Sequence, residues 1–214
     1  MTALARAIPL SHLKTNSYGS DSDLRKGLPS LPHGTICEIL GDSSTGRTAV
    51  AYAMLATATW GGGVVAVVDS DDVFDPATAQ LAGADLGKLL WVQCGHSVER
   101  ALRAADMILH GGGFGLIVLD LCDASAVALN RVPISYWHRF RRAVEQTPSI
   151  LLVLARQSVA RSCATRQFEL RQTEVQWRGA PPFQTMDRLS LSAVSRKPMG
   201  MNPVDLEAFA EAGA

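Results

Sequence analysis

The feature that most constrains the fold of this chain is an eight-residue stretch, GDSSTGRT, between an apolar run and an alanine-rich run. Phosphate-binding loops follow the pattern G-x-x-x-x-G-K-[ST], come directly after a strand and open a helix. Their glycines let the backbone amides surround a phosphate, and the helix N-terminus adds its dipole. The spacing, both glycines and the final threonine match. The sequence therefore predicts a phosphate-binding loop made of Gly41, Asp42, Ser43, Ser44, Thr45, Gly46, Arg47 and Thr48.

The loop departs from the pattern at one position, where Arg47 replaces the lysine. Lysine reaches the β- and γ-phosphates as a compact point charge, whereas arginine presents a wide planar guanidinium. Thr48 keeps the hydroxyl that can ligate Mg²⁺ beside a bound nucleotide. Two interpretations stay open: a loop that still binds a nucleotide, and an inherited turn that has lost nucleotide binding.

The rest of the chain alternates short apolar runs with helical stretches. The predicted strands are Thr35–Leu40, Val64–Asp69, Leu89–Cys94, Gly115–Asp120 and Ile150–Ala155, and the predicted helices are Thr48–Thr59, Pro76–Leu86, Val98–Leu109 and Ser135–Gln146. Strands that are apolar on both faces, separated by helices, indicate a parallel sheet covered on both sides. After Gln157, TEVQWR and DRLSLSAV alternate polar and apolar residues around a Gly/Pro turn. The predicted fold class is α/β, with a mainly parallel central sheet, helices on both faces and a C-terminal antiparallel hairpin.

We expect a single core domain at residues 31–197, preceded by a lead-in at residues 1–30 and followed by a tail at residues 198–214. No apolar run reaches the roughly 18 residues of a membrane span, and the N-terminus lacks the apolar stretch of a secretory signal. Four scattered cysteines without a C-x-x-C pair argue against a zinc site or a disulfide framework. The expected setting is the reducing cytoplasm, with no membrane partner.

Acidic residues follow two of the predicted strands. Asp120 ends the apolar run LIVLD and is a candidate ligand for Mg²⁺ opposite the Thr48 hydroxyl. The stretch DSDDVFDP, from Asp69 to Pro76, lies at the end of another predicted strand, where a general base for an attacking water would be needed. Asp75 precedes Pro76 and is better explained as a helix cap. Asp71 remains the candidate base.

The basic residues concentrate in one part of the chain. Residues 131–197 hold 12 of the 20 basic side chains and only 4 of the 20 acidic ones. Such a segment suits a phosphate or carboxylate partner, although a solvated face explains it too. Arg139, Arg141 and Arg142 cluster on one predicted helix, and Trp137 is a candidate apolar anchor among them. We favour a protein partner here over single-stranded DNA, since no basic and aromatic stacking platform is present.

Together these stretches resemble the RecA family of recombinases, from about Leu28 to Lys197. LPHGTICEILGDSSTGRT resembles the stretch leading into that family's phosphate loop, and LIVLD its magnesium-binding strand. VVDSDDVFDP resembles the segment whose glutamate activates water, which places Asp71 at that position. ILLVLARQ resembles the strand that ends in a glutamine sensing the γ-phosphate. Arg156 falls on the sensor position, with Gln157 one step away.

Three positions that the family pattern places at the reacting end of the nucleotide depart together: Arg47, Asp71 and Arg156. We therefore expect binding of ATP and Mg²⁺ to be weak or lost, and turnover to be weak at most. A small, degenerate RecA-like chain is similar to the ImuA group of accessory proteins in SOS-induced translesion synthesis. That resemblance implies two partners, RecA and an ImuB-type polymerase-like protein, and allows single-stranded DNA as a third.

Two other functions stay open beside the accessory role. One is an active ATP-dependent recombinase paralogue that binds single-stranded DNA. The other is a cell-division inhibitor similar to the SulA group, which also derives from the RecA fold. The retained GDSSTGRT loop argues against the SulA-like function, because that group lacks a recognisable phosphate loop.

Overall fold

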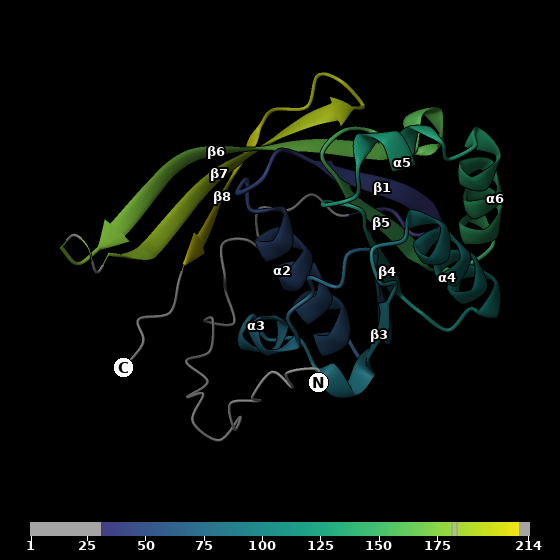
Figure 1. The fold of residues 1–214 in the computed structure, drawn as a ribbon, viewed down its shortest axis with the longest axis horizontal. Coiled ribbons are helices and arrows are strands. Elements are labelled where there is room, and N and C mark those ends of the chain that lie inside the picture. Colours follow the sequence, from purple (N-terminus) through teal and green to yellow (C-terminus); the bar gives the residue numbers. More distant parts are fainter. Residues whose placement is uncertain (1–30, 181, 183, 210–214) are drawn as a thin grey trace.

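A computed structural model describes residues 31–180, 182 and 184–209, so the predicted lead-in at residues 1–30 lies outside the described residues. These residues form an eight-stranded sheet in the order β3-β2-β4-β5-β1-β6-β7-β8 (Figure 1). Strands β1 to β6 pair in parallel, whereas β7 pairs antiparallel with β6 and β8 antiparallel with β7. The predicted α/β fold class is confirmed.

The strands and helices lie close to the predicted ranges. The strands are β1 Thr35–Leu40, β2 Val65–Asp69, β3 Leu89–Gln93, β4 Leu116–Asp120, β5 Ile150–Ala155, β6 Arg166–Arg178, β7 Thr185–Lys197 and β8 Val204–Phe209. The α-helices are α2 Arg47–Trp60, α3 Pro76–Leu81, α4 Val98–Gly111, α5 Ala126–Asn130 and α6 Ile134–Glu145. Short 3-10 turns at Leu86–Lys88 and Arg161–Cys163 complete the described elements.

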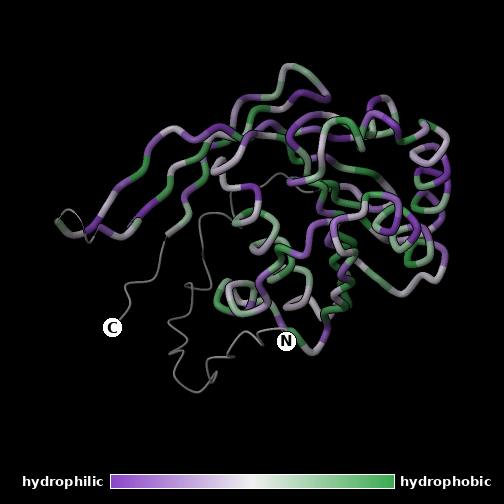
Figure 2. The backbone as a smooth tube through the Cα atoms, viewed as in Figure 1, coloured by the Kyte–Doolittle hydropathy of each residue, from purple (hydrophilic) through white to green (hydrophobic). Residues whose placement is uncertain are grey.

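Two apolar layers cover the sheet, one on each face. In Figure 1, α2 and α3 lie on one side of the sheet and α4 and α6 on the other. The first layer joins α2 to β1, β2, β4 and β5, and the second joins α4 and α6 to the opposite faces of the same strands. The tube in Figure 2 is accordingly most hydrophobic along the central strands. This two-sided burial is what the continuously apolar strands predicted.

The predicted hairpin is present and is longer than the sequence indicated. Strands β6 and β7 each run for 13 residues and extend beyond the helical layers in Figure 1. Together with β8, these two strands form an arm of three strands. Strand β8 lies in the stretch that the sequence analysis assigned to a tail. Its Leu206 is buried at 1%, as is Leu191, its register partner on β7. The apolar face of β7 therefore gives β8 a surface on which to pack.

Three further details differ from the sequence analysis. Helix α3 ends at Leu81, and Leu86–Lys88 forms a separate 3-10 turn capped by Asp85. Helix α5 was not predicted, because its five residues are too few for a helical period to be recognised. Strand β3 is only partly buried, since it is the edge strand of the sheet.

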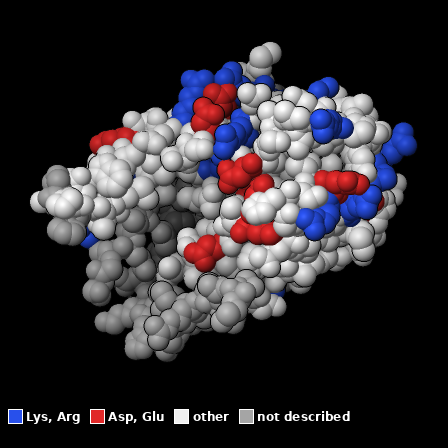
Figure 3. All heavy atoms as spheres, in the orientation of Figure 1, with Lys and Arg blue, Asp and Glu red and all other residues white. Residues whose placement is uncertain are grey.

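On the face of the molecule seen in Figure 3, acidic and basic side chains lie beside one another. Arg139 pairs with Asp106 at 2.8 Å, and Arg141 pairs with Glu145 at 2.7 Å. Further ion pairs join Arg156 to Asp123, Arg178 to Asp187, and both Arg171 and Arg196 to Glu169. Part of the basic surplus is thus neutralised within the fold.

Candidate functional site

The predicted phosphate loop lies between β1 and α2, at the carboxyl edge of the parallel strands. Gly46 is the N-cap of α2 and has φ 80° and ψ 12°, a left-handed conformation that a side chain disfavours. The Thr45 hydroxyl donates to the carbonyl oxygen of Asp42 at 2.8 Å, which braces the turn. The first N–H groups of a helix have no intrahelical partner and are available to an anion. The loop therefore turns into α2 in a way that leaves the first N–H groups of the helix without intrahelical partners.

The arm packs against this loop. A Cβ atom on Gly46 would lie 2.5 Å from Leu191 Cδ1, and a Cβ on Gly41 would lie 2.9 Å from the carbonyl oxygen of Leu170. Both approaches are too short for real carbon contacts. The two glycines are thus required by packing against β6 and β7, independently of any phosphate.

Arg47 is folded into the protein. Its side chain is the first of α2, and the residue is only 7% exposed. Its Nη1 atom is buried and has no hydrogen-bond partner among the described residues. Burial raises the pKa of Asp120 and of the Cys122 thiol, while the charge on Arg47 opposes both shifts. The guanidinium therefore lies within electrostatic reach of the end of β4.

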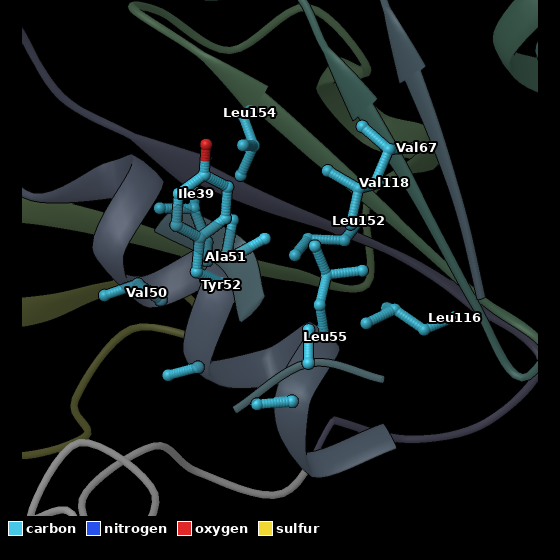
Figure 4. Close-up of a cluster of buried hydrophobic side chains, with 14 of the residues drawn as sticks. Ile39, Val50, Ala51, Tyr52, Leu55, Val67, Leu116, Val118, Leu152 and Leu154 are labelled. Atoms are coloured by element: carbon cyan, nitrogen blue, oxygen red, sulfur yellow. The ribbon is translucent and has the colours of Figure 1, made fainter. Parts of the chain in front are cut away.

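The two predicted magnesium ligands, Thr48 and Asp120, line the same cavity of about 180 Å³. Figure 4 shows Tyr52 and Leu55 of α2 on one side of this region, facing Val67, Val118 and Leu154 of the sheet. Besides Thr48 and Asp120, the polar residues that line this cavity are Tyr52 and Asp123. Asp120 Oδ1 accepts a hydrogen bond from the backbone N–H of Cys122 at 2.9 Å.

Thr48 and Asp120 are the protein oxygens that would hold Mg²⁺ here. Mg²⁺ usually keeps several waters and takes only one or two protein carboxylates beside substrate phosphates. One oxygen of Asp120 is already engaged, and the Arg47 charge acts on the same carboxylate. Across the described ranges, no three His, Cys, Asp or Glu side chains come together as a metal-binding group.

The candidate base Asp71 follows β2 and has contacts of its own. Ser70 Oγ donates to Asp71 Oδ2, and His96 Nδ1 lies 3.5 Å from Asp71 Oδ1. Asp71 is not among the residues that line the cavity of Thr48 and Asp120. Asp75 caps α3 by accepting from the N–H groups of Ala77 and Thr78, as predicted. The structure thus separates the capping carboxylate from the candidate base.

The two residues at the sensor position, Arg156 and Gln157, meet the phosphate loop in a second cavity, of about 820 Å³. Gly41, Asp42 and Thr45 line its loop side. Arg156 Nε donates to the carbonyl oxygen of Cys122 at 3.0 Å, and its Nη2 atom lies 3.4 Å from Asp123 Oδ1. The guanidinium therefore joins the end of β5 to the loop that follows β4.

Glu38, a residue that the sequence analysis did not single out, organises the loop after β5. It is fully buried, and its Oε1 accepts from the N–H groups of Val159 and Ala160 at 2.8 and 2.7 Å. Its Oε2 accepts from Ser158 Oγ at 2.8 Å and Gln167 Nε2 at 2.7 Å. The available signal was one acidic residue inside the apolar strand TICEIL, since a buried carboxylate requires partners.

The partner-binding residues predicted on α6 divide between two environments. Trp137 is 1% exposed and packs edge-on against Phe140, with the ring centroids 5.8 Å apart. It is a core residue, so its predicted role as a surface anchor is corrected. Arg139, Arg141 and Arg142 lie on the exposed side of the helix, and Arg139 also stacks over the Tyr136 ring at 4.9 Å.

Comparison with known proteins places this site in a family context. A family described as RecA N-terminal domain matches residues 5–131, a region that begins inside the predicted lead-in. Protein RecA of Mycobacteroides abscessus is 38% identical over 112 residues, which cover 52% of this chain and 32% of that protein. Protein RecA of Nocardia farcinica is 39% identical over 112 residues, covering 52% and 31%. The match spans about a third of the length of these relatives.

No helix among the described residues is long and apolar enough to cross a membrane.

Proposed function

The chain belongs to the family of the RecA N-terminal domain, and from this premise we propose that it is a RecA-like accessory protein of SOS-induced translesion DNA synthesis, similar to the ImuA group. It would act by binding RecA and an ImuB-type polymerase-like protein. Its phosphate loop would hold a phosphate group weakly and would not drive efficient ATP turnover. Its working place would be the cytoplasm.

One observation carries this proposal: the side chains at the three altered positions are either buried or hydrogen-bonded within the protein. Arg47 is buried, Asp71 accepts a hydrogen bond from Ser70 Oγ, and Arg156 Nε donates one to the Cys122 carbonyl oxygen. Groups that stabilise a transition state must point at the place where charge develops. Because the side chains at the three altered positions have internal positions of their own, we infer that this RecA fold is used for binding.

The alternative is an active ATP-dependent recombinase paralogue that binds single-stranded DNA. Two observations favour it: the loop turns into α2 through a left-handed Gly46, and Thr48 and Asp120 line one cavity. The two functions differ in what the exposed arginines of α6 contact. A DNA role predicts an affinity that falls steeply with salt concentration. A protein role predicts that salt mainly slows association, while the apolar part of the interface still contributes affinity.

The test is a titration of the full chain with RecA, with the ImuB-type protein and with single-stranded DNA at matched ionic strength. We expect charge reversal of Arg139, Arg141 and Arg142 to weaken protein binding more than DNA binding. Arg178→Glu is the matched control, because Arg178 also forms an exposed ion pair, with Asp187 at 2.5 Å, but lies on the arm. A larger loss of DNA binding in the α6 variant would favour the recombinase paralogue instead.

A further inference from the structure

The sheet ends in an open edge at β8, the last strand of the arm (Figure 1). Strand β8 pairs with β7 from Val204 to Phe209, and no described strand lies on its other side. Successive residues of an antiparallel strand direct their backbone N–H and C=O groups to alternate sides, so about half of these groups in β8 point away from β7. A row of unpaired groups of this kind can accept a further strand.

Strand β8 lacks the features that usually keep a further strand away from a sheet edge. Natural edges often carry a lysine, a proline or a β-bulge. The β8 sequence VDLEAF contains neither lysine nor proline, and its pairing with β7 keeps one register from Val204 to Phe209. The backbone of this edge is therefore regular enough for continuous pairing.

Two other stretches of the sheet edge are open among the described residues, and both differ from β8. Strand β6 has no partner beyond Glu169 on the side of β1, but register shifts interrupt it after Gln172 and after Gln176. Such irregularities twist an edge and hinder pairing. Strand β3 has the sequence LLWVQ and carries no charge, so it does not select a partner strand by charge.

The side chains of β8 form an apolar row on one face and an acidic row on the other. Leu206 and Ala208 are buried, whereas Asp205 is exposed and Glu207 is half-buried. Glu207 lies 3.5 Å from Arg188 on β7. The Asp205 carboxylate, in contrast, has no ion pair or hydrogen bond with any described residue. An added strand would therefore lie beside a carboxylate that is not neutralised within the fold.

These charges discriminate between the possible occupants of the edge. If two copies of the chain joined through antiparallel β8 strands, Asp205 would face Asp205 or Glu207 of the other copy, and like charges directly opposite each other are destabilising. Nucleic acid is disfavoured for the same reason, because its phosphates are negative. A strand with lysine or arginine at the facing positions instead gains an opposite-charge pair.

We propose that β8 binds an extended segment of another protein, which adds to the sheet as a ninth strand. The segment alternates apolar and basic side chains. Its apolar side chains continue the row of Leu206 and Ala208, and its basic side chains lie beside Asp205 and Glu207. The backbone hydrogen bonds supply the affinity, and the side chains supply the selectivity. This interaction surface is separate from the phosphate loop and from the arginines of α6, so it does not rest on the function proposed for either.

Fluorescence anisotropy of a labelled peptide, titrated with the full chain, tests the inference. The probe is an eight-residue peptide of alternating valine and lysine with blocked ends. One control peptide has glutamate in place of lysine, and the other carries N-methyl groups on two consecutive central amides, which interrupt both of its edges. We expect each control to bind at least about fivefold more weakly than the probe. A smaller difference for either control, or no binding of the probe, would overturn the inference.

Charge reversal at the edge assigns the binding to β8. Asp205→Lys should weaken binding of the valine–lysine peptide and strengthen binding of the valine–glutamate peptide, each by about fivefold. Glu174→Lys makes the same change at an exposed residue of β6, the other open edge of the arm, and should leave both affinities within about twofold. Equal effects of the two variants would overturn the assignment to β8. Thermal unfolding checks that both variants are folded.

Sedimentation of the full chain tests the second copy as the occupant. We expect wild type to show no self-association through this edge at the concentrations of the titration. A dimer whose dissociation constant changes about fivefold or more in Asp205→Lys, but not in Glu174→Lys, would identify β8 as a contact between two copies and overturn the proposal.

Discussion

Arg156 Nε donates a hydrogen bond to the carbonyl oxygen of Cys122, 3.0 Å away. This contact ties the residue after β5 to a residue two positions beyond Asp120, at the carboxyl edge of the sheet. By resemblance, Arg156 stands where a RecA protein has the glutamine that senses the γ-phosphate. A side chain held in this way stabilises the loop after β4 through its Nε and Nη2 atoms.

The first prediction is that restoring lysine alone does not create an ATPase. Arg47→Lys repairs one position, but Asp71 and Arg156 still lie in their internal contacts, and groups that act as a unit are not additive. Steady-state phosphate release should stay near background for Arg47→Lys. It should rise clearly only in the triple variant Arg47→Lys, Asp71→Glu, Arg156→Gln. Strong turnover from the single change would contradict the account of three coupled defects.

The second prediction concerns Glu38. Its carboxylate accepts two backbone N–H groups through Oε1, and in Glu38→Gln an amide nitrogen facing these donors would leave buried groups unpaired. We expect Glu38→Gln to lower the free energy of unfolding by about 2 kcal/mol. Glu174→Gln, an exposed change on β6, should stay within about 0.5 kcal/mol. Urea denaturation of both variants measures the difference, and equal stabilities would contradict the role given to Glu38.

The third prediction distinguishes two tryptophans. Trp137 is 1% exposed inside the layer under α6, whereas Trp177 on the arm is 59% exposed. Trp137→Ala should cost about 3–5 kcal/mol of stability, because it leaves a cavity. Trp177→Ala should cost less than about 0.5 kcal/mol. If Trp137→Ala were well tolerated in denaturation experiments and abolished partner binding, the anchor role predicted from sequence would have to be restored.

The fourth prediction is a pH dependence at Glu169. Burial alone would raise the pKa of this carboxyl, but hydrogen bonds and charges from Arg196 and Arg171 outweigh it and lower the pKa below 4.5. The unfolded chain therefore binds the proton more readily, so the stability contributed by Glu169 is present above pH 4.5 and is lost as the pH falls through the folded pKa.

Urea denaturation of wild type and Glu169→Gln between pH 7 and pH 3 checks this sign. The stability gap between the two proteins should narrow as the medium becomes acidic. In an Arg196→Met background the gap should shrink at pH 7, because the principal partner is missing. A gap that widened in acid would show that the carboxylate is not stabilised by its arginines.

The fold was largely predictable because its central strands are apolar on both faces and alternate with helical stretches. Helix α6 shows where the interpretation of function went wrong. Trp137, Phe140 and Val144 recur at helical spacing and are all buried, so periodicity alone could have placed Trp137 in the core. The neighbouring arginines lie on the opposite, exposed face of α6, and their presence suggested a surface role for Trp137.

Other features depend on contacts that no local pattern contains. Strand β8 is stable because Leu206 meets Leu191 on β7, a partner that only the folded arm supplies. Arg47 is buried, and the motif, which has a lysine at this position, does not predict that burial. Thr48 and Asp120, paired by the sequence analysis, line one cavity, but the sequence did not predict the Arg47 charge that acts on Asp120.

The central claim is that this chain uses a RecA fold for binding and not for efficient phosphoryl transfer. Single-turnover hydrolysis of ATP, with protein in excess and with and without single-stranded DNA, tests it most directly. The account predicts that the fraction of ATP cleaved matches the uncatalysed control in both conditions. A DNA-stimulated burst of cleavage that disappears in Thr48→Ala would contradict it and identify an active recombinase paralogue.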